Sequence, residues 1–103
     1  MYLTMNRFKV TIGQEAAFED VWRRRDSHLK EVPGFVSFDL LRGATTDNHT
    51  LYASHTVWQS RAAFEDWTRS EAFRNAHAGI RPNTDLYRAA PELEIFESIQ
   101  SVR

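Results

Sequence analysis

The amino-acid sequence predicts a single α+β domain whose strands and helices follow the order βαββαβ. Four segments have the alternation or the residue types of strands, and apolar residues recur at helical spacing after the first and the third of them. Glycine, proline and polar turns separate these segments. The order is that of the ferredoxin-like split βαβ unit. A chain of 103 residues suffices for one such domain, spanning residues 1–103.

The first strand is expected over residues 2–10, and a helix follows a glycine a few residues later. In the strand, Asn6 shares one face with Phe8 and Val10. Three consecutive arginines, at positions 23–25, crowd the second half of the helix. Its apolar stripe should consist of Phe18, Val21, Trp22 and Leu29.

A hairpin is expected next, with one strand from Phe35 to Arg42 and another from Leu51 to Trp58. A polar turn at positions 45–48 would join the two strands. Strict alternation puts Phe35 and Leu41 on one face of the first strand, opposite Val36, Phe38 and Leu40.

The last part of the chain predicts a loop and a fourth strand. Positions 80–91 show no sustained period and contain Pro82 and Pro91, which is typical of a long loop. The final strand is expected from Leu93 to Val102.

Composition excludes several classes of partner and chemistry. A net charge of −1 gives no reason to expect nucleic acid or an anionic membrane surface. No apolar run could span a bilayer, and the N-terminal residues lack the apolar core of a signal peptide. The absence of cysteine excludes disulfides, thiolate metal sites and iron–sulfur clusters, and fits a cytoplasmic protein. Since no glycine-rich nucleotide fingerprint is present, any redox reaction needs electrons from outside the chain.

Both faces of the expected sheet carry apolar residues, whereas the helices can cover only one. The other face is therefore expected to pack against a second copy of the chain, in an isologous homodimer with two-fold symmetry.

The segment at positions 56–79 organises the rest of the chain. It predicts the end of a strand and then two short helices, the first capped by Ser60. The second would begin at Ser70 and end at Gly79. Within it, Phe73 and His77 lie four residues apart and so share a face.

The residue pattern in this segment resembles that of the IsdG-type haem-degrading monooxygenases of the antibiotic-biosynthesis-monooxygenase superfamily. The pattern is carried by Trp58, Ser60, Ala63, Phe64, Asp66, Trp67, Ser70, Phe73, Ala76 and His77. The resemblance covers about positions 5–79 and implies a dimer whose two sheets form a shared α+β barrel. Those enzymes use an Asn on the first strand, a Trp and a His, and this chain offers Asn6, Trp67 and His77 in those places.

The resemblance implies a role for each of these residues. His77 would be the axial ligand of the haem iron, and Asn6 would donate a hydrogen bond toward an oxygen ligand or the porphyrin edge. Trp67 would press the porphyrin out of plane, while Phe64 and Phe73 would line the pocket. Haem would be substrate and oxygen activator at once, with O2 and electrons supplied by a reductase or a small-molecule reductant.

Each of these residues also has an ordinary structural interpretation. A His near a helix C-terminus suits the helix dipole, an Asn in a strand can bond backbone groups, and a Trp at helical spacing is commonly core. His55 competes with His77 as a ligand but is interpreted as a barrel or interface residue, and His28 and His49 are expected to be solvated. The arginines at 23–25 could meet haem propionates or form an exposed basic face.

Two further functions remain open. One is a cofactor-free monooxygenase of the same superfamily, acting on a quinol or an anthrone, which needs no axial His. The other is a haem carrier that binds without turnover. The loop at 80–91, which starts close to His77, is expected to act as a lid that haem orders.

Overall fold

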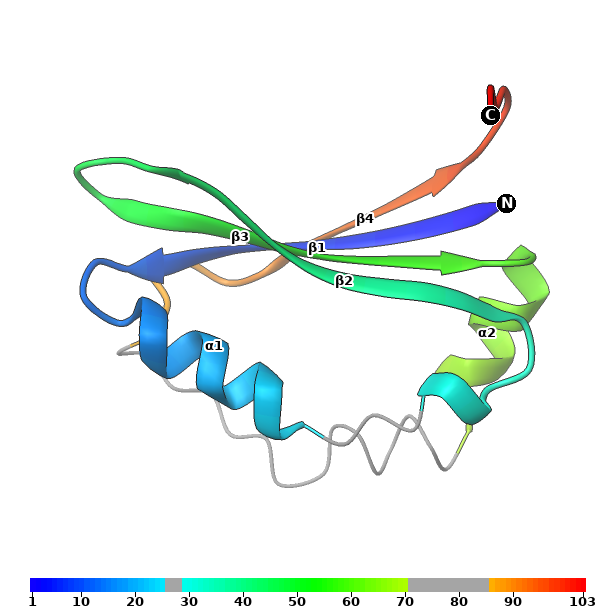
Figure 1. The fold of residues 1–103 in the computed structure, drawn as a ribbon, viewed down its shortest axis with the longest axis horizontal. Helices are drawn as coiled ribbons and strands as arrows, with labels where there is room; N and C mark the ends of the chain where they lie inside the picture. Colours follow the sequence, from blue (N-terminus) through cyan, green and yellow to red (C-terminus); the bar gives the residue numbers. More distant parts are fainter. Residues whose placement is uncertain (26–28, 71–85) are drawn as a thin grey trace.

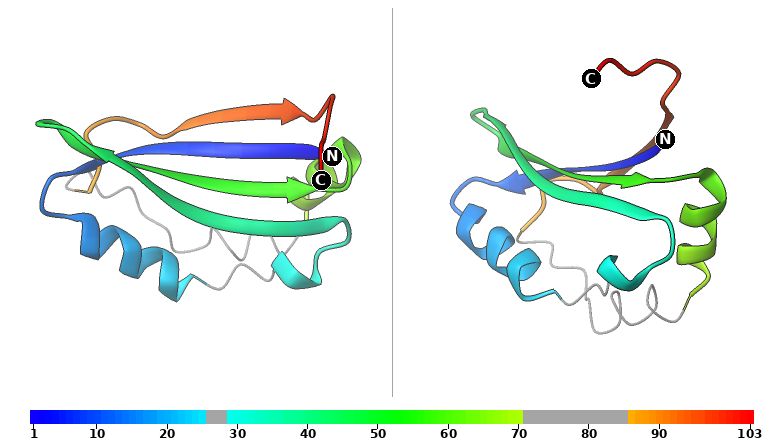
Figure 2. Two further views of the ribbon diagram at one scale, coloured as in Figure 1. Left: turned by 45° about the horizontal axis from the view of Figure 1, so that its top comes forward. Right: turned by 45° about the vertical axis from the view of Figure 1, so that its right-hand side comes forward.

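The structure is a computed structural model that describes residues 1–25, 29–70 and 86–103 (Figure 1). Its elements, in chain order, are β1 (Tyr2–Thr11), α1 (Glu15–Arg24), the 3-10 helix η1 (Leu29–Glu31), β2 (Phe35–Thr45), β3 (His49–Trp58), α2 (Arg61–Thr68) and β4 (Glu92–Glu97). The strands form one antiparallel sheet in the order β2-β3-β1-β4, and both α-helices lie on the same side of it (Figure 2). This confirms the ferredoxin-like α+β fold. Within the described residues no helix is long and apolar enough to cross a membrane.

The alternation of the two central strands determines which side chains face the helices. Every second residue of β3 from Thr50 to Trp58 is buried. On β1, Phe8 and Val10 are buried on the same face as Tyr52, which is aligned with Phe8. Asn6 shares this face, as the sequence predicts, so its amide lies on the helix side of the sheet.

Helix α1 covers one end of this face. The ring centroid of Phe18 lies 5.3 Å from that of Phe8 and 4.7 Å from that of Tyr52. Trp22 packs against the same cluster. Phe18 is fully buried, and this aromatic group therefore fills the space between α1 and the sheet.

Two members of the predicted helical stripe lie elsewhere. Val21 is 40% exposed, because each helical residue turns about 100° around the axis and Val21 is thereby turned away from Trp22. Leu29 belongs to η1, because the backbone at Arg25 is already extended and α1 ends one residue before it.

A β-bulge near the start of β2 changes the face that Phe35 occupies. Phe35 is aligned with Trp58, and the register shifts by one residue immediately afterwards. Phe35 and Phe38 therefore both face the helices, with ring centroids 6.0 Å from Trp58 and 5.7 Å from Trp22, respectively. Strict alternation separates these two phenylalanines, so that part of the prediction is wrong, and the bulge is the reason.

The three largest differences in strand boundaries are at the end of β4 and at the two ends that meet in the hairpin turn. β4 ends at Glu97 rather than Val102, because Glu97 is aligned with Tyr2, the first residue of β1, and β1 is its neighbour in the sheet. The hairpin strands are longer than expected. They run to Thr45 and from His49, and the backbone N–H of Thr46 donates to the carbonyl of His49 at 2.8 Å to close the turn.

The described end of the predicted loop at 80–91 is anchored to β1. The backbone N–H of Thr11 donates to the carbonyl of Leu86, and that of Arg88 donates to the carbonyl of Lys9, each at 2.8 Å. Leu86 is 5% exposed, and Tyr87 packs against the aromatic group of α1. Positions 80–85 lie outside the described residues, so the lid remains a prediction for that part.

The opposite face of the sheet carries none of the described helices. Its side chains come from the alternate positions of the strands, including Leu3, Met5, Leu41, Val57 and Phe96. Leu41 and Phe96 are 43% and 47% exposed. The expected second apolar face is therefore present in the fold.

Candidate functional site

A strip of polar side chains crosses the helix-facing side of the sheet, between the rings packed under α1 and those packed under α2. It consists of two aligned pairs, Thr4 with Thr56 and Asn6 with Ser54. Thr4, Ser54 and Thr56 are each no more than 9% exposed. Because strands usually bury apolar residues on their helix-facing side, this strip is a candidate for function rather than for packing.

The Asn6 amide has an unsatisfied oxygen. Its Oδ1 atom is buried and has no hydrogen-bond partner among the described residues. A buried acceptor left without a donor costs about 1–3 kcal/mol. Such atoms call for an explanation, and a catalytic role or an ordered water molecule is among the accepted ones.

Helix α2 positions the aromatic wall next to the strip. The side chain of Ser60 accepts a hydrogen bond from the backbone N–H of Ala63 at 3.1 Å, which confirms the predicted N-cap. From this N-cap, α2 directs Phe64 and Trp67 toward Trp58. Their ring centroids lie 5.9 and 5.3 Å, respectively, from that of Trp58. Trp58 is completely buried.

The polar strip and the aromatic wall are joined by one hydrogen bond. The indole Nε1–H of Trp58 donates to Oγ1 of Thr4 at 3.3 Å. Asn6 lies two residues further along β1 on the same face, which places its Cα about 7 Å from that of Thr4.

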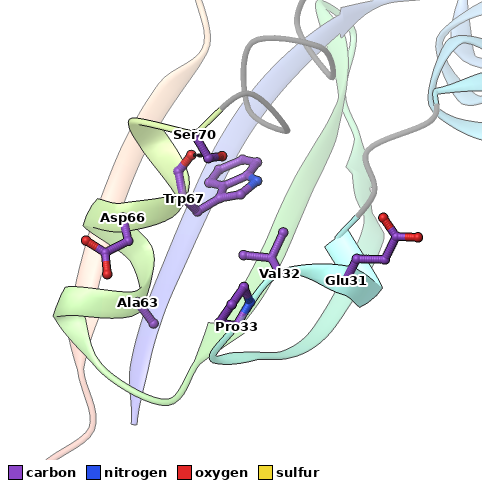
Figure 3. Close-up of a pocket in the computed structure, with 7 residues that line it drawn as sticks. All are labelled: Glu31, Val32, Pro33, Ala63, Asp66, Trp67 and Ser70. Carbon is purple, nitrogen blue, oxygen red and sulfur yellow. Dashed lines mark hydrogen bonds between the residues drawn. The ribbon is translucent and has the colours of Figure 1, made fainter.

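A pocket of about 380 Å³ opens between α2 and the segment that contains η1. It is lined by Glu31, Val32, Pro33, Ala63, Asp66, Trp67 and Ser70. In Figure 3 the Trp67 indole and Val32 face one another across it, whereas the carboxylates of Asp66 and Glu31 point away. The pocket therefore has an apolar interior, and its volume lies within the roughly 300–1,000 Å³ typical of ligand sites.

Gly34 allows the two sides of this pocket to approach closely. Its φ of +83° is a conformation that favours glycine, and a Cβ there would lie 2.4 Å from the Cβ of Ala63. Its carbonyl accepts a hydrogen bond from the backbone N–H of Gln59 at 2.8 Å. A side chain at this position would push α2 away from the η1 segment.

The three arginines of α1 are not equivalent. Arg23 and Arg24 are exposed and form ion pairs with Asp20, so they fit the solvated basic face. The guanidinium of Arg25 instead lies 4.0 Å from the ring centre of Trp22. Burial lowers the pKa of Arg25, although the side chain stays charged at any physiological pH. Arg25 is therefore a partly desolvated cation on an aromatic face.

The structure brings some of the predicted site residues together. Asn6, Phe64 and Trp67 all lie on the helix-facing side, and the rings of Phe64 and Trp67 are in contact, with centroids 6.5 Å apart. His77 and Phe73 lie outside the described residues, so their roles stay predictions. No cluster of three potential metal-ligating His, Cys, Asp or Glu side chains occurs within the described part of the chain.

The other histidines fall into two classes. His55 is half-buried on the sheet face opposite the helices, as its strand parity predicts. His49 is not a solvated turn residue, because it begins β3 and is half-buried, with its Nδ1 enclosed. His28 lies outside the described residues.

Sequence reasoning overlooked Thr4 and Ser54 of the polar strip, and it noted Trp58 as part of the resemblance pattern without assigning it a place in the site. The signal was available, because Thr4 and Asn6 share a parity on β1 and Ser54 and Thr56 share one on β3. Two polar pairs aligned on one predicted face would have indicated the strip.

Comparison with known proteins identifies what the chain is similar to. The family model described as antibiotic biosynthesis monooxygenase matches residues 1–79. A haem-degrading monooxygenase of Shouchella clausii is 34% identical over 64 residues, an alignment that covers 62% of this chain and 59% of the relative. The aligned part is thus less than two thirds of that relative's length.

Two solved structures resemble the whole fold. The haem degrader MhuD from Mycobacterium tuberculosis, with two haems bound in its active site, has a TM-score of 0.76 and 29% identity, and the match covers 100% of both chains. A mutant of SnoaB, a cofactor-independent oxygenase from Streptomyces nogalater, has a TM-score of 0.70 and 29% identity, covering 98% of this chain and 95% of that one.

Proposed function

The chain belongs to the antibiotic biosynthesis monooxygenase family, and on that premise we propose that it is a monooxygenase that degrades haem. The observation that carries the proposal is an apolar pocket lined by Trp67 on the same side of the sheet as Asn6, whose buried Oδ1 has no hydrogen-bond partner among the described residues. The likeness to a haem-degrading monooxygenase of Shouchella clausii and to MhuD supports haem as the substrate.

The described residues fit a large flat aromatic ligand with an anionic edge. Trp67 lines the pocket and offers its indole for contact, Phe64 supports it with ring centroids 6.5 Å apart, and the Asn6 side chain offers both an acceptor and two donors. Among the three arginines of α1 we assign propionate binding to Arg25, which lies over Trp22, rather than to Arg23 and Arg24, which are exposed and ion-paired with Asp20. These residues would bind and orient the substrate, while haem supplies the redox chemistry.

Four finer statements belong to the same proposal. His77 is the proximal ligand of the iron, on the strength of the sequence pattern. Electrons come from a separate reductase or small-molecule reductant, and O2 is the oxidant. The products are iron and a linear tetrapyrrole. The chain works in the cytoplasm as a homodimer, in which the apolar outer sheet face packs against its counterpart.

Titration with haem, followed by reduction in air, tests the function. Wild-type protein should bind haem and develop a Soret band, and added ascorbate should make that band decay as the ring opens. A band that persists under reductant would identify a haem carrier instead. Absence of any stable haem complex would refute the proposal.

The ligand assignment has its own test. His77→Ala should lose the spectrum of His-ligated haem and all turnover, whereas His55→Ala should keep both. If the His55 variant loses the spectrum and the His77 variant retains it, the axial ligand is misassigned.

A second candidate function is a cofactor-free oxygenase acting on a quinol or an anthrone. The similarity to SnoaB at 29% identity over nearly the whole chain favours it. Such an enzyme would consume O2 with a quinol in the absence of haem, and haem would not bind in stoichiometric amounts. The haem titration therefore separates the two candidates.

A further inference from the structure

We propose that Thr4 is a positioning residue for the reaction, acting through Trp58 on Trp67. The inference rests on the proposed contact between Trp67 and haem. Neither Thr4 nor Trp58 lines the pocket, so their effect must pass through the side chains they touch.

Trp58 is the centre of the aromatic group at the α2 end. Its ring packs edge-on against Phe35 and Phe64, at 6.0 and 5.9 Å between centroids, and lies tilted against Trp67 at 5.3 Å. The side chain is completely buried. A rotation of this indole would therefore displace Trp67, because close-packed interiors transmit strain.

The Thr4 hydroxyl fixes that rotation. An indole has a single donor, Nε1–H, and in Trp58 it is given to Oγ1 of Thr4 at 3.3 Å. Thr4 is 7% exposed and sits in the middle of the sheet, so the acceptor is held rigidly. The chain of contacts runs from β1 through the last residue of β3 to the pocket wall on α2.

Thr56 provides a matched control. It is the residue aligned with Thr4 on the neighbouring strand, it faces the same side, and it is 9% exposed. The Trp58 donor goes to Thr4 and not to Thr56. Thr4→Val and Thr56→Val thus replace the same hydroxyl by a methyl group at similarly buried positions. Only Thr4→Val removes the acceptor of the Trp58 indole.

The haem-free protein gives the first measurement. The chain has three tryptophans, so its ¹H–¹⁵N spectrum holds three indole signals that Trp→Phe variants can assign. Thr4→Val should move the Trp58 signal and also the Trp67 signal, Thr4→Ser should restore both, and Thr56→Val should leave the Trp67 signal in place. The inference is overturned if the chemical shift of the Trp67 indole does not change in Thr4→Val, or if it changes equally in Thr56→Val.

The Trp58→Phe background tests the route even if Thr4→Val folds poorly, because no indole donor is then left unpaired. Adding Thr4→Val to Trp58→Phe should not move the Trp67 signal further, since coupled residues are not additive. A further shift in the double variant would mean that Thr4 acts on Trp67 by another path.

The haem complex gives the functional measurement. Thr4→Val should change the haem-proton shifts and lower kcat roughly tenfold with little change in KM, because small misplacements near the reacting group are costly. Thr4→Ser should restore the rate, and Thr56→Val, which keeps the Thr4 acceptor, should lower kcat less than Thr4→Val does. Normal rates and haem-proton shifts in Thr4→Val, alongside a defective Trp67→Ala, would refute the inference and leave the proposed function intact. If Trp67→Ala also behaves as wild type, the proposed contact between Trp67 and haem is wrong.

Discussion

The two ends of the helix-facing sheet surface are built differently. Under α1, Phe8, Phe18 and Tyr52 form a closed aromatic core in which Phe18 is fully buried. Under α2, Phe64 and Trp67 are half-buried, Trp67 lines a pocket, and Trp58 beside them bonds to the polar strip that holds Asn6. The half under α1, here called the closed half, is packed to stabilise the fold. The half under α2, here called the open half, has the space to accept a ligand.

The hydrogen bonds that join the sheet to the helices lie mainly at α1. There, Thr50 donates to Glu15 and Tyr52 donates to Glu19, so polar groups of β3 are paired with the helix above them. Buried polar atoms without a partner among the described residues include Asn6 Oδ1 in the polar strip, Trp22 Nε1 on α1 and His49 Nδ1 at the start of β3. The unpaired oxygen of Asn6 therefore gains its interest from its place in the polar strip.

The largest effect is expected in the closed half. Phe18→Ala should lower the free energy of unfolding by about 3–5 kcal/mol, because it leaves a cavity in a fully buried cluster. Phe64→Ala should cost clearly less, since Phe64 is half-buried beside an existing pocket. Urea denaturation of both variants measures the difference. Equal losses would mean that the two halves are packed alike.

In the open half, a substitution should lower the rate of haem degradation rather than the free energy of unfolding. Asn6→Ala should bind haem with near-normal affinity but degrade it on the order of 10²–10³ more slowly, the typical cost of losing one electrostatic donor. Its unfolding free energy should not fall, because the variant removes an unsatisfied buried atom. Unchanged turnover would remove Asn6 from the mechanism.

A smaller effect is expected from the helix caps. Ser60→Ala removes the N-cap of α2 and should cost about 1 kcal/mol of stability. It should also weaken haem binding, because α2 carries Phe64 and Trp67. Gln14 holds the same position before α1 without a side-chain cap hydrogen bond, so Gln14→Ala should be neutral. Calorimetry and haem titration on the two variants would show whether the caps differ in this way.

The closed half should also make the free energy of unfolding depend on pH in the alkaline range. Burial, followed by the bond to Glu19, raises the pKa of Tyr52 to about 12. The folded state then holds the phenolic proton more tightly than the unfolded state, so this contribution is complete below about pH 10 and is lost as pH rises through about 12. Tyr52→Phe should flatten the fall in stability over that range. An identical fall in the variant would assign the alkaline loss to other groups.

The sequence predicted the fold more completely than the site. Period-two alternation placed Asn6, Phe8 and Val10 on one face correctly because β1 is regular along its length. The same rule failed for Phe35, because a bulge adds a residue that alternation cannot anticipate.

The candidate site residues show the same difference between features set by local sequence and features set by distant contacts. The helix that carries Phe64 and Trp67 was predicted correctly because local spacing and a cap define it, while the roles of the two residues remain predictions. Trp58 and Thr4 were missed as a pair because their hydrogen bond joins residues 54 positions apart. Arg25 likewise looked the same as its two neighbours in sequence, and only its position over Trp22 distinguishes it.

The most direct test of the contrast is the loss of NMR signal on adding ferric haem, whose paramagnetism broadens nearby resonances. The account predicts that the amides of Thr4, Asn6 and Ser54 and the indole signal of Trp67 disappear at stoichiometric haem. The amides at the far end of the hairpin, from Thr45 to Thr50, should remain sharp. Broadening centred on the hairpin end or on the outer sheet face, with the Asn6 and Trp67 signals intact, would contradict it.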